Sequence, residues 1–245
     1  MAFTLDGKAA LVTGSGRGIG RAIALRLAEA GAAVLINDLD DAEASQTESL
    51  VRSCGGKAER LAGDVTAPEF PQRLVDATLA AFGGIDIIVN NAGYTWDNVI
   101  QKTTDEQFQA MLDIHLTAPF RILRAASAYI RETAKREIAE GRRVMRKVVN
   151  ISSVSGTGGN AGQVAYASGK AGILGLTRTL AKEWGRYNVN VNAVAFGLIE
   201  TRLVQPLAPE SPGVEIGGRR IVLGVRPEAL EHFKAVCPLG RLGTP

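Results

Sequence analysis

Two side chains of this sequence have the types and spacing needed to move a proton on or off an alcohol. Tyr166 and Lys170 lie four residues apart, so on a helix they share one face. A free phenol has a pKa of ~10, too high for a base at neutral pH, and a nearby ammonium lowers that pKa by stabilising the phenolate. Tyr166 would then accept a proton in oxidation and donate one in reduction. Ser153, thirteen residues before Tyr166, brings a hydroxyl that could hydrogen-bond the substrate oxygen.

A glycine-rich run near the amino terminus has the composition of a phosphate-binding turn. It joins a predicted strand to a predicted helix, and its glycines allow a sharp turn and a close approach to a ligand. The helix that follows offers unpaired amides and the positive end of its dipole to a pyrophosphate. The alternative is a tight turn that binds nothing. The predicted cofactor-binding residues of this turn are Gly14, Ser15, Gly16, Arg17, Gly18, Ile19 and Gly20.

The residue that ends the second predicted strand bears on the choice of cofactor. Asp38 lies eighteen residues beyond Gly20, where a carboxylate can accept hydrogen bonds from both adenosine ribose hydroxyls and repel a 2′-phosphate. Arg17 has the opposite tendency, because a guanidinium in the turn can pair with that phosphate. Since like charges at contact distance are hard to accommodate, Asp38 favours NAD as the cofactor, with NADP as the alternative. Asp38 could also simply cap the next helix.

The elements that must position these residues alternate along the chain. Short β-branched strands between longer helices imply parallel pairing through right-handed crossovers. The strands are apolar throughout, as expected when helices cover both faces of the sheet. The predicted strands span residues 8–13, 33–38, 58–64, 85–90, 147–152 and 188–194, and the predicted helices 18–30, 41–54, 68–82 (with Pro68 in its first turn), 104–140 and 164–184.

This pattern predicts an α/β fold with a doubly wound parallel sheet of the Rossmann type. Neither an internal repeat nor a linker divides the sequence, so residues 1–245 are expected to form a single NAD(P)-binding domain. Ligands of such sheets bind at the carboxyl ends of the strands. Residues 198–238 are rich in Pro and Gly and have no clear period, which is typical of a lid or substrate-binding loop.

Composition and charge argue against several classes of function. The net charge is +3 and the pI about 9.0, and the sequence has no zinc-finger or helix-turn-helix spacing, so neither nucleic-acid binding nor a metal site is predicted. Cys54 and Cys237 occur in unlike contexts and are expected to be reduced thiols. The sequence starts without a signal-peptide pattern, and no apolar run reaches the ~18 residues that span a bilayer. We therefore expect a cytoplasmic protein.

Several motifs together resemble those of the short-chain dehydrogenase/reductase family. The resemblance covers about residues 5–243. The amino-acid sequences of segments 159–163, 197–201 and 238–243 most resemble those of bacterial 3-oxoacyl-[acyl-carrier-protein] reductases and related hydroxyacyl dehydrogenases. The motifs that carry the family resemblance are Thr13-Gly14-x-x-x-Gly18-x-Gly20, Asn90-Asn91-Ala92-Gly93, and Ser153 with Tyr166-x-x-x-Lys170.

The resemblance implies an NAD(P)-dependent oxidoreductase that interconverts a secondary alcohol and a ketone. It implies that Ser153, Tyr166 and Lys170 are catalytic, that Lys170 also holds the nicotinamide ribose, and that the protein forms a homodimer or homotetramer. The further cofactor contacts that it implies are Asp64, Val65, Asn91, Ala92, Gly93, Tyr166, Lys170, Gly197, Ile199 and Thr201.

The sequence departs from the family's pattern at three places. His115 stands where the family usually has an Asn that supports a proton-relay water; an imidazole could hold the same water, relay a proton itself, or only pack locally. Phe196-Gly197 replaces the usual Pro-Gly after the sixth strand. The sequence ends at Pro245, so the family's last helix and strand, which often contribute to subunit contacts, are expected to be missing from this chain.

Three interpretations of the substrate and function are compatible with the sequence. The leading one, which the resemblance implies, is a 3-oxoacyl or 3-hydroxyacyl thioester linked to coenzyme A or a carrier protein. The basic stretch 131–147 would suit an acidic carrier protein or a coenzyme A phosphate through charge steering. A steroid, a cyclic alcohol or a polyol is the second, since the motifs do not distinguish these substrates. A nucleotide-sensing regulator without catalysis is the third, and the intact Ser153, Tyr166 and Lys170 argue against it.

Overall fold

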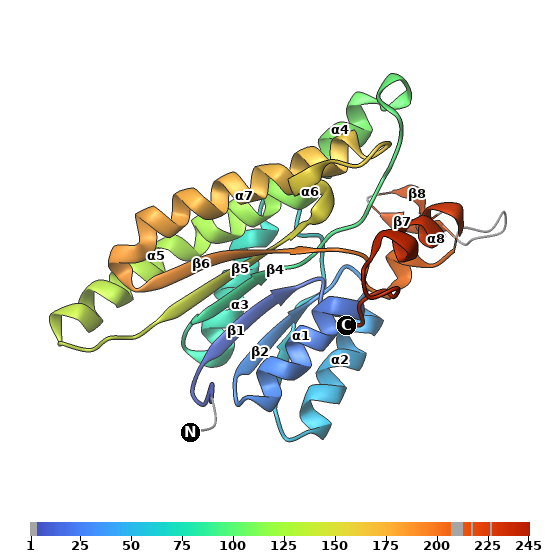
Figure 1. Cartoon of the computed structure of the whole chain (residues 1–245). Helices are drawn as coiled ribbons and strands as arrows, with labels where there is room; N and C mark the ends of the chain where they lie inside the picture. Colours follow the sequence, from blue (N-terminus) through green and yellow to red (C-terminus); the bar gives the residue numbers. More distant parts are fainter. Residues whose placement is uncertain (1–3, 207–212, 217, 226) are drawn as a thin grey trace.

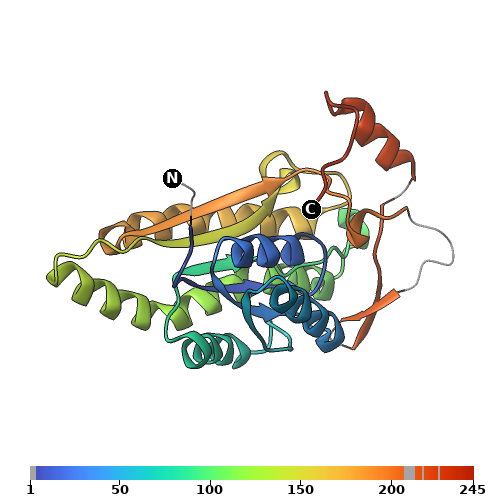
Figure 2. The same ribbon diagram turned by 90° about the horizontal axis from the view of Figure 1, so that it is seen from below.

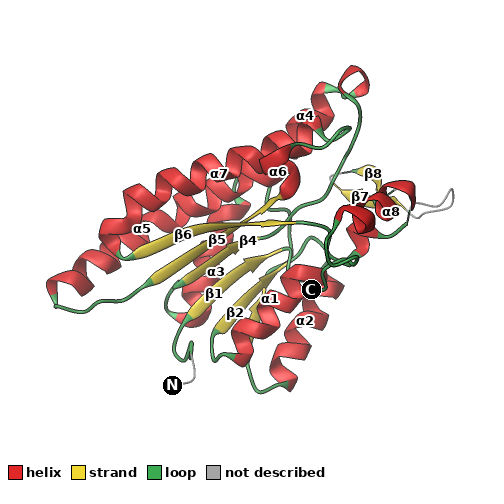
Figure 3. Ribbon diagram, viewed as in Figure 1, coloured by secondary structure: helices red, strands yellow, loops and turns green. Residues whose placement is uncertain are grey.

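The computed structural model describes residues 4–206, 213–216, 218–225 and 227–245. Six parallel strands form one sheet in the order β3-β2-β1-β4-β5-β6 (Figures 1 and 3). This order confirms the doubly wound α/β fold. The strands are β1 (Ala9–Thr13), β2 (Ala33–Asn37), β3 (Lys57–Arg60), β4 (Ile87–Asn90), β5 (Arg146–Ser153) and β6 (Val189–Phe196).

Helices cover both faces of the sheet. One face carries α1 (Gly18–Glu29) and α2 (Asp41–Ser53), which pack on each other and on β1 to β3. The other face carries α3 (Phe70–Phe82), α5 (Ala118–Ala139) and α7 (Val164–Trp184), as Figures 1 and 2 show from two directions. Two short helices, α4 (Asp105–Leu112) and α6 (Val154–Gly158), lie near the amino-terminal part of α7.

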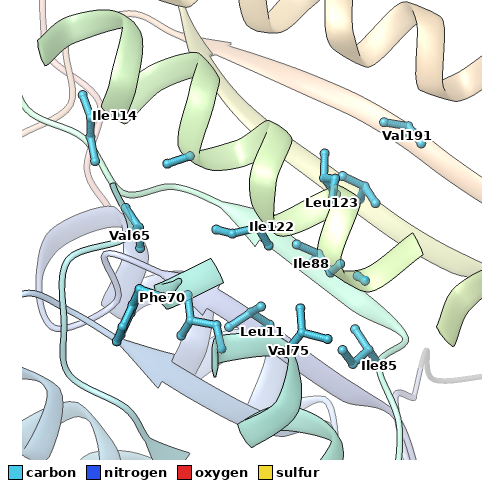
Figure 4. Close-up of a cluster of buried hydrophobic side chains, with 14 of the residues drawn as sticks. Leu11, Val65, Phe70, Val75, Ile85, Ile88, Ile114, Ile122, Leu123 and Val191 are labelled. Carbon is cyan, nitrogen blue, oxygen red and sulfur yellow. The ribbon is translucent and has the colours of Figure 1, made fainter. Parts of the chain in front are cut away.

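The side chains of each strand alternate between two apolar layers. Leu11 packs in the layer under α3 and α5, drawn in Figure 4, whereas Val12 packs with the residues of α1 and α2 on the opposite face. Ile122 and Leu123 of α5 fill the first layer against Ile88 of β4. Because both faces of the central strands are buried, the strands are apolar at consecutive positions, as the sequence indicated.

Several predicted boundaries are wrong. β3 ends at Arg60 rather than at residue 64, and Asp64 lies in the loop that follows. Pro71, not Pro68, occupies the first turn of α3, which begins at Phe70. Since proline fixes its own φ and lacks an N–H, either position was compatible with a helix start, and only the tertiary packing of Phe70 places the start at that residue.

The predicted helix 104–140 is present as helical structure over 105–139, but it is not a regular α-helix throughout. A single turn of π-helix, η2 (Asp113–Thr117), separates α4 from α5, and His115 lies in this turn. Pro119 follows directly in the first turn of α5 and has no N–H to donate, which disfavours a regular α-helical ladder there. Turns of this kind occur frequently at functional sites because they reorient one side chain within a helix.

The predicted irregular region 198–238 contains regular structure in its described parts. It forms a turn of 3₁₀-helix, η4 (Arg202–Val204), the antiparallel hairpin β7 (Gly213–Ile216) and β8 (Arg219–Val222), and α8 (Pro227–Val236). The hairpin and α8 lie beyond the carboxyl ends of the strands (Figure 1). Residues 207–212, 217 and 226 of this region lie outside the described residues.

β6 forms one edge of the sheet. Its side chains that face α7, including Val191, are buried, whereas Asn190, Asn192 and Val194 on the other face are exposed. Among the described helices, none combines the length and the apolar character needed to cross a bilayer. The same residues contain no group of three His, Cys, Asp or Glu side chains arranged to hold a metal ion.

Candidate active site

The carboxyl ends of the six strands open onto one large cavity. Its volume is about 1840 Å³, and its wall is formed by the loops that follow all six strands, together with residues of the β7–β8 hairpin and α8. A usual ligand pocket has a volume of roughly 300–1,000 Å³. The cavity therefore has room for a dinucleotide and a substrate beside it, at the end of the sheet where ligands of this fold bind.

The glycine turn has a backbone that only glycine can adopt without strain at its closest contacts. Gly14 has a φ of 61°, and a Cβ there would lie 2.7 Å from Ala92 Cα. A Cβ at Gly20 would overlap the carbonyl oxygen of Gly14. The N-terminus of α1 has no side-chain cap, because Arg17 at the N-cap position makes no such bond. Its first amides thus remain available to an anion.

Asn91 fastens this turn to the end of β4. Its Nδ2 donates to the carbonyl oxygens of Thr13 at 3.0 Å and of Gly14 at 2.9 Å. The amides of Asn91 and Ala92 both donate to Thr13 Oγ1 at 3.1 Å. Asn91, Ala92 and Gly93 all line the cavity, so this motif supports the cofactor turn from behind and also forms part of its wall.

Ser15 and Gly16 do not line the cavity, although the sequence predicted both as cofactor contacts. The Ser15 side chain is buried and donates to Val12 O at 2.8 Å, and the Ser15 amide donates to Asn37 O. The Gly16 amide donates to Asp38 Oδ2 at 2.9 Å. Both amides are therefore occupied by contacts that join β1 to β2, and both residues brace the turn.

The charged residues beside the turn bear directly on cofactor choice. Asp38 lines the cavity at the end of β2, and the amides of Gly16 and Asp40 fix its carboxylate. Arg17 is not free to receive a phosphate, because its guanidinium lies 2.8 Å from Asp40 Oδ2 and 3.4 Å from Glu43 Oε1. These two carboxylates neutralise the one feature of the turn that favoured NADP.

Ser153 and Tyr166 meet at the other end of the cavity. Ser153 ends β5 and caps α6, where its Oγ accepts from the amide of Ser155 at 3.1 Å. A side-chain hydrogen bond joins Ser153 to Tyr166, and it lowers the pKa of the phenol, whereas burial, the larger effect, raises that pKa. The neighbouring Ser152 points to the opposite side of β5 and donates to Lys170 O at 2.7 Å. The geometry therefore favours Ser153 over Ser152.

Lys170 is buried beneath the Tyr166 ring. Its Nζ donates to Ile151 O at 2.6 Å and lies 5.7 Å from the centre of the phenol ring. Burial lowers the pKa of Lys170 from 10.5 to about 7, so its side-chain nitrogen can gain or lose a proton near neutral pH. The predicted lowering of the Tyr166 pKa by Lys170 together with the oxidised nicotinamide stays a prediction.

His115 contacts both of these residues. Its ring packs edge-on against Tyr166, with 4.9 Å between the ring centroids. Its Nε2 lies 2.8 Å from Tyr94 O, which can only accept, so Nε2 carries the hydrogen. Burial and the charge of Lys170 lower the pKa of His115 well below 6.5, and the bond to Tyr94 opposes this. The imidazole is therefore neutral, and its buried Nδ1 has no partner among the described residues.

The remaining predicted cofactor contacts lie along the cavity between these two ends. Asp64 and Val65 line it, and Asp64 Oδ1 accepts from the amide and the hydroxyl of Thr66. Gly197, Ile199 and Thr201 line it on the side of β6, next to Phe196.

The chain near residue 243 pairs with this β6 segment, a contact that the sequence did not predict. The amide of Glu200 donates to Gly243 O at 2.8 Å, and the amide of Gly243 donates to Leu198 O at 3.0 Å. The segment 238–243 thereby supports the cavity wall.

The basic stretch 131–147 lies at the end of the sheet where the strands begin, opposite the cavity. It occupies the end of α5 and the start of β5, at the left of Figure 1, whereas the cavity lies at the other end of the strands. β5 has eight residues, which span roughly 26 Å at 3.3 Å per residue. Arg142 already pairs with Glu140, and Arg146 is buried. These residues do not line the cavity, and their role in steering a partner stays a prediction.

Two residues on the cavity wall were missed or underused by the sequence analysis. Asp97, in the loop after β4, accepts a hydrogen bond from Gln163 Nε2 at 2.6 Å. Gln163 forms the N-cap of α7, three residues before Tyr166. No local pattern indicates this contact, because 66 residues separate the two side chains in the sequence.

Comparison with known proteins agrees with this geometry. A family model described as short chain dehydrogenase matches residues 8–212. The chain belongs to this family. As a short-chain dehydrogenase, it is an oxidoreductase that acts on CH–OH groups with NAD(P).

Relatives within the family carry several names. The chain is 37% identical over 243 residues to a 3-oxoacyl-[acyl-carrier-protein] reductase of Vibrio cholerae, covering 99% of this chain and 87% of that protein. It is 39% identical over 218 residues to a hydroxyacyl-CoA dehydrogenase of Mycobacterium tuberculosis, covering 87% and 68%. A solved structure of a short chain dehydrogenase from Mycobacterium avium has a TM-score of 0.75 at 36% identity, covering 84% and 73%.

Proposed function

We propose that this short-chain dehydrogenase interconverts 3-oxoacyl and 3-hydroxyacyl thioesters with NAD as its cofactor. The observation that carries this proposal is the meeting of Ser153, Tyr166 and Lys170 at one end of a cavity whose other end is the glycine turn. The substrate class is inferred from the relatives named as 3-oxoacyl-[acyl-carrier-protein] reductase and hydroxyacyl-CoA dehydrogenase. An acyl chain could lie along the apolar wall that includes Ile221 and Val222 of β8.

The choice of NAD is supported by the charges at the adenosine end. Asp38 presents a fixed carboxylate where the ribose hydroxyls would bind, and hydroxyls can donate to it. A 2′-phosphate would meet that carboxylate, together with Asp40 and Glu43 around Arg17. The open amides at the start of α1 and the glycine turn would hold the pyrophosphate.

The residues at the other end would handle the proton. When bound, the nicotinamide supplies or accepts the hydride. Tyr166 is protonated at neutral pH, because burial raises the pKa of its phenol, so it can donate its proton to the carbonyl oxygen of a ketone. Ser153 hydrogen-bonds the Tyr166 side chain and would stabilise negative charge on the carbonyl oxygen of the ketone. Lys170, with a pKa of about 7, can return a proton toward Tyr166.

His115 would act as an acceptor in this proton path. Its neutral ring, and an Nδ1 that no described residue hydrogen-bonds, favour holding a water over charging the imidazole. We expect His115→Asn to keep most activity and His115→Leu to lower kcat roughly tenfold, the value of about one hydrogen bond. Steady-state rates are compared at equal folded fraction, since the bond to Tyr94 O is also lost. A fully active Leu variant would leave His115 a packing role only.

The test of the proposed function is the oxidation of NADH with acetoacetyl-CoA as substrate, followed at the nicotinamide absorbance band. We expect turnover with NADH and at least about tenfold lower kcat/KM with NADPH, since each tenfold corresponds to ~1.4 kcal/mol. A preference for NADPH would mean that Arg17 leaves its carboxylate partners and outweighs Asp38. No turnover with either cofactor would remove the thioester proposal and favour cyclic, steroid or polyol alcohols.

A further inference from the structure

Asp97 is a carboxylate that the proposed chemistry does not use, although it lies on the wall of the active-site cavity. Its side chain is exposed, and its Oδ2 accepts from Gln163 Nε2 at 2.6 Å. Gln163 caps α7, and Tyr166 lies three residues further along. Residues three apart on a helix are neighbours, so the bond to Gln163 holds the carboxylate beside the turn that carries Tyr166.

The position of Asp97 is fixed by a network. Gln163 Oε1 accepts from Ser155 Oγ at 2.8 Å and from Asn160 Nδ2 at 2.9 Å, which sets the orientation of the amide and directs Nε2 toward Asp97. A parallel backbone bridge joins Asn98 to Gln163. The loop after β4 is therefore fastened to the start of α7, and the carboxylate cannot turn away without breaking these contacts.

The titratable side chains that face Tyr166 come from three elements. Lys170 lies on the same helix, the neutral His115 lies on η2, and Asp97 lies in the loop after β4. Burial has the largest effect on the pKa of Tyr166 and raises it; the hydrogen bond with Ser153 lowers this pKa, and the charge of Asp97, the smallest of the three effects, raises it. Further charged residues that line other parts of the same cavity are Arg17, Asp38, Asp40, Asp64, Lys102, Asp113, Arg202 and Glu215.

We propose that Asp97 is a specificity-determining residue, which excludes substrates with a carboxylate next to the reacting ketone and admits those that are neutral there, such as thioesters. This inference rests on the proposed function, because a thioester substrate is neutral next to the reacting ketone. A free 3-oxo acid bound at Tyr166 would bring a second carboxylate toward Asp97, whose side chain is open to the cavity although the protein around it raises the pKa of its carboxyl. Like charges in such a site repel strongly, whereas a thioester carries no charge at that position.

The test compares two small substrates that differ in this charge, methyl acetoacetate and acetoacetate, in NADH-dependent reduction. We expect Asp97→Asn to raise kcat/KM for acetoacetate about 10- to 100-fold while kcat/KM for the ester changes little. The Asn oxygen can still accept from Gln163 Nε2, so the network is kept. Asp76→Asn is the matched control, because Asp76 also accepts from a glutamine, Gln72, at 2.9 Å on the exposed side of α3. An unchanged preference between the two substrates would overturn the proposal.

A second measurement needs no substrate. The phenol titration of Tyr166 is followed by ultraviolet absorbance, as the difference between the wild-type chain and Tyr166→Phe. Since the charge of Asp97 raises the pKa of Tyr166, we expect Asp97→Asn to lower that pKa and Asp76→Asn to leave it in place. An unmoved Tyr166 pKa would overturn the proposal. The thioester function fails only if the wild-type enzyme also leaves acetoacetyl-CoA unreduced, and in that case this titration by itself decides whether the charge of Asp97 acts on Tyr166.

Discussion

Replacement of Tyr166 by phenylalanine is expected to lower kcat roughly 10²- to 10⁴-fold, the usual contribution of a positioned general acid or base. The phenol is the acid nearest the place where a ketone oxygen would meet Ser153, and the variant keeps the ring that packs against His115. Binding of NADH should weaken by no more than about tenfold, the value of about one lost hydrogen bond. The measurement is steady-state turnover beside a fluorescence titration with NADH.

A matched control separates this effect from a general loss of tyrosine hydroxyls. Tyr129→Phe makes the same change on α5, next to Gly84 and away from the cavity, and it should leave kcat unchanged.

The direction of pH dependence follows from the raised pKa of Tyr166. Oxidation needs the phenolate, so its rate should rise with pH, and reduction needs the phenol, so its rate should fall. Comparable turnover by the Tyr166 variant would contradict the mechanism.

Replacement of Arg146 by methionine is expected to lower the free energy of unfolding by roughly 3–5 kcal/mol, because it leaves a buried carboxylate without its partner. The guanidinium forms two parallel hydrogen bonds with Glu137, at 2.7 and 2.9 Å, and both side chains are less than a tenth exposed. For a domain of this size that loss corresponds to a fall in Tm of about 6–20 °C. Urea unfolding followed by circular dichroism measures it.

The exposed ion pair nearby provides the control. Arg142 lies 2.5 Å from Glu140, and both side chains are about half exposed, so Arg142→Met should change stability by less than about 1 kcal/mol. The double variant Arg146→Met with Glu137→Leu should recover much of the loss, because no lone charge remains. Equal effects of the two single arginine variants would contradict this account. At temperatures well below Tm the variant should keep its activity, since Arg146 is the first residue of β5 and lies at the end of this strand away from the cavity.

Acid should weaken the buried pair in a defined way. The hydrogen bond from Arg146 holds the pKa of Glu137 below its usual range, although burial opposes this. A carboxyl whose folded pKa is depressed contributes stability above its unfolded pKa of ~4.3 and loses it as the pH falls through the folded pKa. In Arg146→Met the burial that remains should raise the pKa of Glu137, so this carboxyl takes up a proton at a higher pH than in the wild-type chain. The stability difference between the two proteins should therefore begin to shrink as the pH falls through that raised pKa, and it should keep shrinking down to the depressed folded pKa of the wild-type chain.

The sequence by itself determined the fold class and the local geometry of the site. The alternation of apolar strands with helices predicts a parallel sheet, because only a crossover helix can join such strands. The glycine turn and the pair Tyr166 and Lys170 are also local, since a turn needs φ values that few residues allow and four residues make one helical turn. Helix ends were less certain, as Pro68 and Pro71 illustrate, because tertiary packing chooses between equivalent starts.

The tertiary structure alone decided which of these side chains are free to act. Arg17 could bind a phosphate until Asp40 and Glu43 are brought beside it, and the hydroxyl of Ser15 could face a ligand until it turns into the sheet. Burial makes His115 neutral, and a partner 66 residues away holds Asp97 beside Tyr166. Charge and hydrogen bonding depend on neighbours in space, and a sequence specifies neighbours only within a few residues.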